Sequence, residues 1–162
     1  MMNGCPCGYY ADPKKACRCT PNKIQKYLSK ISGPLLDRID IHIEVPSLKY
    51  KELTSDTEAE SSREIKKRVD EARKVQDKRF KKEDIYFNSQ MSHKQIKKFC
   101  KLNHAAAELL KTAIQELGFS ARAYDKILKV ARTIADLTDS KNIQAEHISE
   151  AIQYRNLDRQ LW

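Results

Sequence analysis

Residues 32–45 of this chain read SGPLLDRIDIHIEV, and their second half alternates apolar and polar side chains. The apolar positions are Ile39, Ile41, Ile43 and Val45, and the polar positions between them are Asp40, His42 and Glu44. A period of two is typical of a half-buried β-strand. Because Gly33-Pro34 interrupts the chain upstream and Pro46 follows the last apolar position, we predict a strand over residues 39–45.

Arg38 lies at the entrance of this predicted strand, directly after Asp37. Its planar guanidinium is always charged and suits a phosphate group on a neighbouring molecule. An isolated Asp-Arg pair is more often a surface salt bridge. The local sequence therefore leaves two interpretations of Arg38, a structural ion pair and a phosphate-binding residue.

The composition limits the class of protein. The 162 residues carry 31 Lys and Arg against 22 Asp and Glu, a formal net charge of +9, which favours polyanionic partners. No apolar run approaches 18 residues, and there is no signal-peptide pattern. We therefore expect a cytoplasmic protein that does not enter a membrane.

Four of the five cysteines form two close pairs, Cys5 with Cys7 and Cys17 with Cys19. Four thiolates in two pairs can surround Zn²⁺ tetrahedrally, although the usual spacing has two residues between paired cysteines and here there is one. Two disulfides or four free thiols are the alternatives, and disulfides are rare in the cytosol. We favour a structural Zn²⁺ site.

The chain changes character after the predicted strand. Residues 47–57, SLKYKELTSDT, have no sustained period and are predicted to be a linker between residues 1–46 and a helical part over residues 58–162. The first helix is predicted to begin at Thr57, whose spacing to Glu60 is that of a capping box. Its expected apolar stripe consists of Ile65, Val69, Ala72 and Val75.

This first helix is strongly basic. Ten Lys or Arg and four Asp or Glu lie between Arg63 and Lys82, so the segment carries +6 of the net charge. Such a run is most often a solvated helix face, and its concentration here also indicates a contact with nucleic acid. The candidate residues are Lys66, Lys67, Arg68, Arg73 and Lys74. No aromatic residue interleaves these five, so the contact is predicted to be phosphate-driven and blind to sequence.

Four further helices are predicted from capping signals and apolar periodicity. Ser92 with Gln95 is a second capping box, Gly118 ends the next helix, and Ser120 begins the one after it. The last helix is predicted from about Gln144. Arg122 lies in the first turn of the helix after Ser120, where the helix dipole disfavours a cation unless an anion such as a phosphate is bound.

These segments, in this order, resemble the AAA+ ATPases, and specifically the magnesium-chelatase-like branch that includes the ComM type. Residues 1–8, MMNGCPCG, resemble the end of the strand that carries the sensor-1 asparagine, and residues 20–29 resemble the short helix before the arginine finger. Residues 32–45 resemble the finger segment itself. Residues 119–124, FSARAY, resemble the start of the lid helix that bears the sensor-2 arginine, and the match extends to residues 147–155.

The resemblance implies a mainly α fold, in which a helical lid bundle follows a small remnant of the α/β ATPase core with one or two strands, a cysteine-rich loop and a short helix. It implies ATP and Mg²⁺ as cofactors and a homo-oligomeric ring, a hexamer by the resemblance. Arg38 would be the arginine finger, Asn3 the residue that orients the attacking water, and Arg122 the sensor of the γ-phosphate. The chain has no GxxxxGK[ST] loop, so it is expected to be the C-terminal part of a longer ATPase and inactive alone.

Combined with the basic surplus, the resemblance implies a motor that acts on DNA, of the helicase or branch-migration type. One alternative is a magnesium-chelatase motor subunit that remodels a protein partner with the same site. The other is a zinc-stabilised basic module that binds nucleic acid without catalysis.

Overall fold

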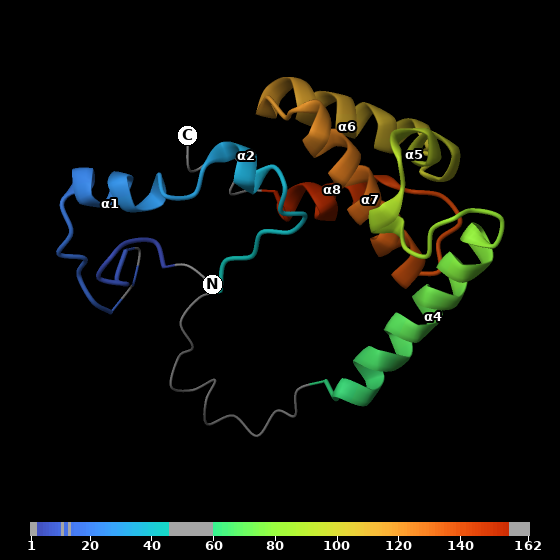
Figure 1. Cartoon of the computed structure of the whole chain (residues 1–162), viewed down its shortest axis with the longest axis horizontal. Coiled ribbons are helices and arrows are strands. Elements are labelled where there is room, and N and C mark those ends of the chain that lie inside the picture. The colour runs from blue at the N-terminus through green and yellow to red at the C-terminus, as the bar shows by residue number, and fades with distance from the viewer. Residues whose placement is uncertain (1–2, 11, 13, 46–59, 156–162) are drawn as a thin grey trace. The chain divides into compact units, whose positions relative to one another are not determined.

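The computed structural model describes residues 3–10, 12, 14–45 and 60–155 (Figure 1). These residues belong to two compact units, with residues 3–45 in the first and residues 60–155 in the second. The linker predicted over residues 47–57 lies outside the described residues. Helices dominate the described part, which confirms the predicted mainly α fold class.

The first unit contains two short helices. Helix α1, Pro21–Leu28, begins with a proline in its first turn, after Thr20 in extended conformation. Proline suits this position because its fixed φ is helical and its missing N–H would have no partner there. Helix α2, Gly33–Leu36, is a single turn that also has a proline at its start, and it buries Leu36. Gly33-Pro34 therefore begins a helical turn and does not merely interrupt the chain.

The strand predicted over residues 39–45 is not formed. Apart from one isolated bridge between Leu102 and Ile143, the described residues contain no β-pairing. The four apolar side chains are not buried either, since Ile43 is 67% exposed and His42 is the one buried residue of this segment. A strand is stabilised by hydrogen bonds to a neighbouring strand and by burial of one face, and the described residues form no strand that pairs with residues 39–45. Residues 3–8 likewise form turns and not the end of a strand.

The second unit begins with helix α4, Ser62–Phe80. Its capping box pairs Ser61 with Glu64, and not Thr57 with Glu60 as predicted. Thr57 lies outside the described residues. Both pairs have the Ser/Thr-x-x-Glu spacing, so the local pattern did not distinguish them.

The remaining elements follow the predicted order. They are the 3₁₀ turn η1, Asn88–Gln90, and the helices α5, His93–Phe99, α6, His104–Leu117, α7, Ala121–Leu137, and α8, Ala145–Gln153. The side chains of Ser92 and Ser120 cap α5 and α7 as predicted. Gly118 ends α6 with a φ of 63°, a left-handed conformation that glycine adopts without strain. These caps are local, which is why the sequence predicted them well.

Helix α7 is the centre of the second unit, because α4, η1, α5 and α8 all pack against it (Figure 1). Ile127, Leu128, Ala131 and Ala135 form its buried stripe. Leu110 of α6 and Ile148 of α8 complete the same core. None of the helices in the described residues is long and apolar enough to cross a membrane.

Only the C-terminal half of α4 joins this core. Ala72, Gln76 and Phe80 are buried, whereas Ile65 and Val69 are 44% and 43% exposed. The predicted stripe of Ile65, Val69, Ala72 and Val75 is therefore wrong for its first two members. Figure 1 shows the first turns of α4 extending away from the other helices of this unit.

A buried carboxylate fastens α4 to α7. Asp136 accepts two hydrogen bonds from the guanidinium of Arg79, one of them 2.6 Å long, and another from Arg132 at 3.1 Å. The Asn88 side-chain amide of η1 donates to the same carboxylate at 2.8 Å. Burial lowers the pKa of Arg132, and the charge of Asp136 opposes this shift. One carboxylate thus joins α4, η1 and α7.

We predict that Asp136→Asn strongly destabilises the chain, because two guanidinium groups lose the anion that they share in a buried site. Removal of one partner from such a buried pair costs about 3–5 kcal/mol. Urea unfolding followed by circular dichroism measures this free energy. Asp77→Asn, at an exposed position of α4, is the matched control and should change it by less than about 0.5 kcal/mol. Equal stabilities of the two variants would contradict the assignment.

Candidate functional site

Arg38 follows helix α2 directly. Its main-chain N–H donates to the carbonyl of Leu35 at 3.0 Å, so this hydrogen bond at the end of the helical turn fixes the backbone from which the side chain projects. The side chain is exposed, and the neighbouring Asp37 is half-buried. The predicted strand entrance is therefore a helix end, which presents the same arginine at the surface of the first unit.

Arg122 lies in the first turn of α7, as predicted, and its side chain is exposed. The Ser120 hydroxyl accepts from the N–H of Ala123 at 3.1 Å, which satisfies one of the free amide groups at this helix start. The first turn of α7 contains no acidic residue. The positive partial charge at the start of the helix and the charge of the guanidinium thus reinforce each other, and together they attract an anion.

Asn3 is exposed and lies over the turn formed by the first cysteine pair. A Cβ atom built on Gly8, whose φ is +82°, would be 3.5 Å from Nδ2 of Asn3. The structure thus brings Asn3 close to the cysteine loop. Arg38 belongs to this same unit, whereas Arg122 belongs to the helical unit.

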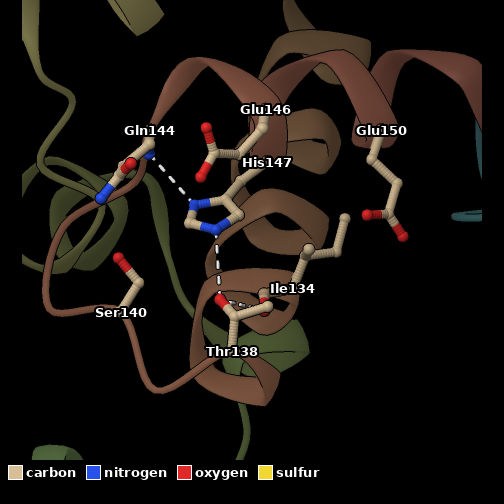
Figure 2. A pocket seen from close by; sticks show the side chains of 7 residues that line it. All are labelled: Ile134, Thr138, Ser140, Gln144, Glu146, His147 and Glu150. Carbon is tan, nitrogen blue, oxygen red and sulfur yellow. Dashed lines mark hydrogen bonds between the residues drawn. The ribbon is translucent and has the colours of Figure 1, made fainter.

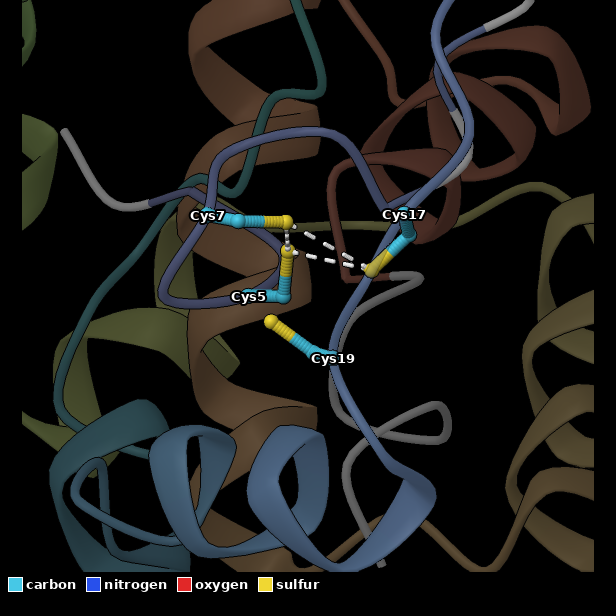
Figure 3. A group of neighbouring side chains, drawn as sticks. All are labelled: Cys5, Cys7, Cys17 and Cys19. Carbon is cyan, nitrogen blue, oxygen red and sulfur yellow. Dashed lines mark hydrogen bonds between the residues drawn. The ribbon is translucent and has the colours of Figure 1, made fainter.

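The four paired cysteines converge across the nine residues that separate the two pairs (Figure 3). Sγ of Cys5 lies 3.3 Å from Sγ of Cys7 and 3.6 Å from Sγ of Cys17, and the last two sulfur atoms are also 3.6 Å apart. With Cys19 included, all four sulfur atoms lie within 4.8 Å of one another. The predicted grouping of the four thiols is present in the structure.

These distances fit a metal centre better than disulfides. A disulfide holds its sulfur atoms ~2.05 Å apart, and all five cysteines are free. With Zn–S bonds of ~2.3 Å, a regular tetrahedron places its sulfur atoms ~3.8 Å apart. The main-chain N–H groups of Tyr9 and Arg18 lower the pKa of Cys7 to about 6, whereas burial and the neighbouring thiols raise the pKa of Cys17 to about 12. Before a metal binds, the thiolate is thus favoured at Cys7 and disfavoured at Cys17.

The loop between the cysteine pairs carries positive charge, as predicted. Its cations Lys14, Lys15 and Arg18 are all exposed. Oδ1 of Asp12 accepts from the N–H groups of Lys14 and Lys15 at 2.7 and 3.0 Å, which organises the turn. Lys15 places its ammonium 5.0 Å above the ring of Tyr9.

The basic helix presents its candidate residues to solvent. The side chains of all five are exposed, namely Lys66, Lys67, Arg68, Arg73 and Lys74. Arg68 is paired with Glu60 at 2.7 Å. Arg73 lies on an aromatic ring, with its guanidinium carbon 3.8 Å from the ring centre of Phe87.

The local sequence pattern did not predict this aromatic partner of Arg73. Phe87 and its neighbour Tyr86 follow α4 in the chain, in the segment before η1, and they are 39% and 67% exposed. No aromatic residue lies between the five cations in the sequence, as predicted, but in the structure the ring of Phe87 lies against one of them, Arg73. Two adjacent exposed aromatic residues in a polar segment were the available signal.

A hollow of about 430 Å³ lies beside the start of α8 (Figure 2). Inside it, Nδ1 of His147 accepts from the N–H of Gln144 at 3.1 Å, and Nε2 lies 3.1 Å from the Thr138 hydroxyl. Since that hydroxyl donates to backbone carbonyls, Nε2 carries the proton and the imidazole caps the helix. We assign this hollow no chemistry, and His147 a structural role.

Comparisons with known proteins agree over both units. The family profile described as magnesium chelatase, subunit ChlI, matches residues 1–53, and the profile of its C-terminal part matches residues 59–155. The competence protein ComM of Haemophilus influenzae is 41% identical over 161 residues, and YifB of Escherichia coli is 41% identical over 162.

These matches cover 99% of this chain but only 30% and 31% of the two relatives, so the chain spans about a third of their length. Salmonella typhimurium YifB is 40% identical over the same extent of the chain. The family profiles together match more than nine-tenths of the sequence, and the second alone matches more than half. The chain therefore belongs to the magnesium chelatase family and is similar to its ComM and YifB members.

Proposed function

We propose that this chain is the C-terminal portion of an ATP-dependent AAA+ motor and supplies residues that act on the nucleotide. The family membership supports the reaction class. The observation that carries the proposal is the pair of exposed arginines at helix ends, Arg38 after α2 and Arg122 in the first turn of α7. Both positions suit an anionic ligand on another surface.

In the proposed mechanism, subunits assemble in a ring, a hexamer in our proposal, with ATP and Mg²⁺ between neighbours. Arg38 reaches into the neighbouring site and stabilises the charge that develops on the γ-phosphoryl group. Asn3 orients the attacking water within its own subunit. Arg122 binds the γ-phosphate and couples the position of the helical unit to the state of the nucleotide.

We predict that Arg38→Ala, introduced into the protein with its preceding ATPase segment, lowers ATP turnover by about 10³-fold or more while ATP binding stays nearly intact. A finger acts on the transition state of a neighbour, so it contributes little to ground-state binding in its own subunit. Steady-state hydrolysis and binding of a fluorescent ATP analogue measure the two quantities.

Lys23→Ala is the matched control for this experiment, because Lys23 is an exposed cation of α1 in the same unit. It should leave turnover unchanged. Arg38→Lys should recover little activity, since an ammonium cannot reproduce the guanidinium fork. Turnover of Arg38→Ala equal to that of the control would refute the finger role.

DNA is the proposed polymer on which the motor acts. The net charge of +9 and the exposed cations of α4 support an anionic partner, and one relative is named a competence protein. We predict that branched DNA stimulates ATP turnover several-fold at low salt and less at high salt. An unstimulated enzyme would favour the other candidate, a chelatase-type motor that remodels a protein partner.

We also infer that Cys5, Cys7, Cys17 and Cys19 hold a structural Zn²⁺. The sulfur distances of 3.3–3.6 Å, close to the edge of a zinc–sulfur tetrahedron, support this inference. A closed site with four thiolates leaves no open position for catalysis, so its role is to hold the loop between the pairs.

We predict that the purified chain contains about one zinc ion per molecule by elemental analysis, and that Cys17→Ser lowers this ratio severely. Cobalt substitution should give thiolate charge-transfer bands. Cys100→Ser is the matched control, because burial raises the pKa of Cys100 to about 12 and its thiol lies in the core of the other unit. Zinc that is absent, or that is retained equally by both variants, would disprove the site.

A further inference from the structure

Three side chains of the helical unit lie together at the surface, and the two aromatic ones among them have no part in the roles described above. The guanidinium of Arg73 lies 3.8 Å from the ring centre of Phe87, and the rings of Phe87 and Tyr86 have centres 6.3 Å apart. Tyr86 is 67% exposed and Phe87 39% exposed. The two rings thus offer adjacent exposed π faces beside a guanidinium group. We call these three residues the Arg73 platform.

The structure holds this platform in place. The side-chain oxygen of Gln90 accepts from the N–H groups of both Tyr86 and Phe87, at 2.8 and 3.1 Å. The ammonium of Lys129, on α7, donates to the carbonyl of Ser89 at 2.9 Å. Hydrogen bonds to the side chains of Gln90 and Lys129 thus hold the backbone segment that carries the two aromatic residues.

The next residue anchors the segment in the core. Asn88 is 2% exposed, and its N–H donates to the buried side chain of Gln76. Its amide donates to Asp136, and its oxygen accepts from Arg79 at 2.9 Å. Two exposed aromatic residues therefore directly precede a fully buried polar anchor. A pre-organised surface of this kind loses little conformational entropy when a ligand binds.

A row of cations runs alongside the platform. Arg63, Lys67, Lys74 and Lys78 are spaced by four, seven and four residues, so they share one face of α4, and all four are exposed. This face is turned by about 100° from Arg73, because successive helical residues are separated by that angle. Fifteen residues separate the ends of the row, which gives it a length of about 22 Å. We call these four residues the cation row.

The acidic residues of α4 indicate which part of a ligand would bind at the Arg73 platform and which part would bind along the cation row. Asp70 and Asp77 flank Arg73 at three and four residues along the helix, on its side of α4. Their charges disfavour phosphate directly at the platform. An anionic backbone would follow the cation row, and uncharged groups with π faces would lie on Phe87 and Tyr86.

We propose that the Arg73 platform is a base-stacking site for single-stranded nucleic acid, whose phosphates follow the cation row. This deepens the proposed function, since it assigns part of the polymer contact to a named surface of the helical unit. Single strands combine a repeated anionic charge with unpaired bases, and aromatic rings beside cations are the features that bind them. A duplex stacks its own bases and offers only phosphates to the same surface.

The charge of the surface favours this occupant over a protein. The segment from Arg63 to Lys82 carries a net charge of +6, from ten cations and four anions. The same surface on a second copy carries the same excess, so two of these surfaces would repel each other. An apolar partner would leave the cation row without a counterpart, whereas a nucleic acid strand satisfies both surfaces at once.

The test is binding of the intact chain, without nucleotide, to a fluorescein-labelled thymidine 20-mer and to a 20-base-pair duplex, measured by fluorescence anisotropy. Phe87→Ala and Tyr86→Ala should each weaken binding of the single strand by about tenfold. The same variants should leave duplex binding within about twofold. A uridine 20-mer in parallel identifies DNA or RNA as the preferred strand.

Conservative variants separate stacking from mere apolar contact. Phe87→Trp retains a π face and should bind at least as tightly as the parent chain, whereas Phe87→Leu retains apolar volume and should bind like Phe87→Ala. Tyr27→Ala is the matched control, because Lys30 lies over the Tyr27 ring in the other unit, with its ammonium 5.6 Å from the ring centre. It should not affect binding.

The salt dependence of strand binding tests the role of the cation row separately from that of the aromatic residues. Lys67→Ala with Lys74→Ala should lower the slope of log Kd against log salt by about 1.4, while the aromatic variants leave the slope unchanged. The proposal is overturned if Phe87→Leu binds the single strand as tightly as the parent chain, or if neither 20-mer binds more tightly than the duplex. Because no ATP is present, either result leaves the Arg38 turnover experiment as an independent test of the motor.

Discussion

The buried carboxylate of Asp136 is the constraint on which the helical unit depends. Three helical elements send side chains to it, Arg79 from α4, Asn88 from η1 and Arg132 from α7 itself. Each charge is costly to bury alone, so the cluster is stable only when all its members are in place. A displacement of α4 would therefore break several hydrogen bonds at once. This gives the basic helix a defined position although half of it has no contact with the core.

The sequence predicted the parts of the fold that local interactions determine. The caps at Ser92, Gly118 and Ser120, and the apolar stripe of α7, need only residues within a few positions of one another. The strand over residues 39–45 failed because alternation describes a strand only when a neighbour pairs with it. The predicted start of α4 was wrong for another reason, since two consecutive capping-box patterns, at residues 57–60 and 61–64, offered equal local signals.

The same distinction applies to the candidate sites. The cysteine cluster was predicted because two close pairs in one short loop need little chain to converge, and the sulfur atoms do meet. The contact between Arg73 and Phe87 was not predicted, because the residues are separated by the end of α4 and a turn. Their approach depends on how Gln76 and Asn88 dock in the core. No periodicity within the helix contains that information.

Helix α4 combines two roles that its period of 3.6 residues keeps apart. Ala72, Gln76 and Phe80 recur every four residues and face the core, while the cation row lies on another side of the helix. Surface charge can therefore change without altering the packing, and the Asp136 cluster can hold the helix without neutralising its exposed cations. Arg73 lies next to buried Ala72, so its position is set by the core although its guanidinium is at the surface. A ligand on the platform would consequently contact a part of α4 whose position relative to α7 is fixed, and force applied there would be transmitted to the helix whose first turn carries Arg122.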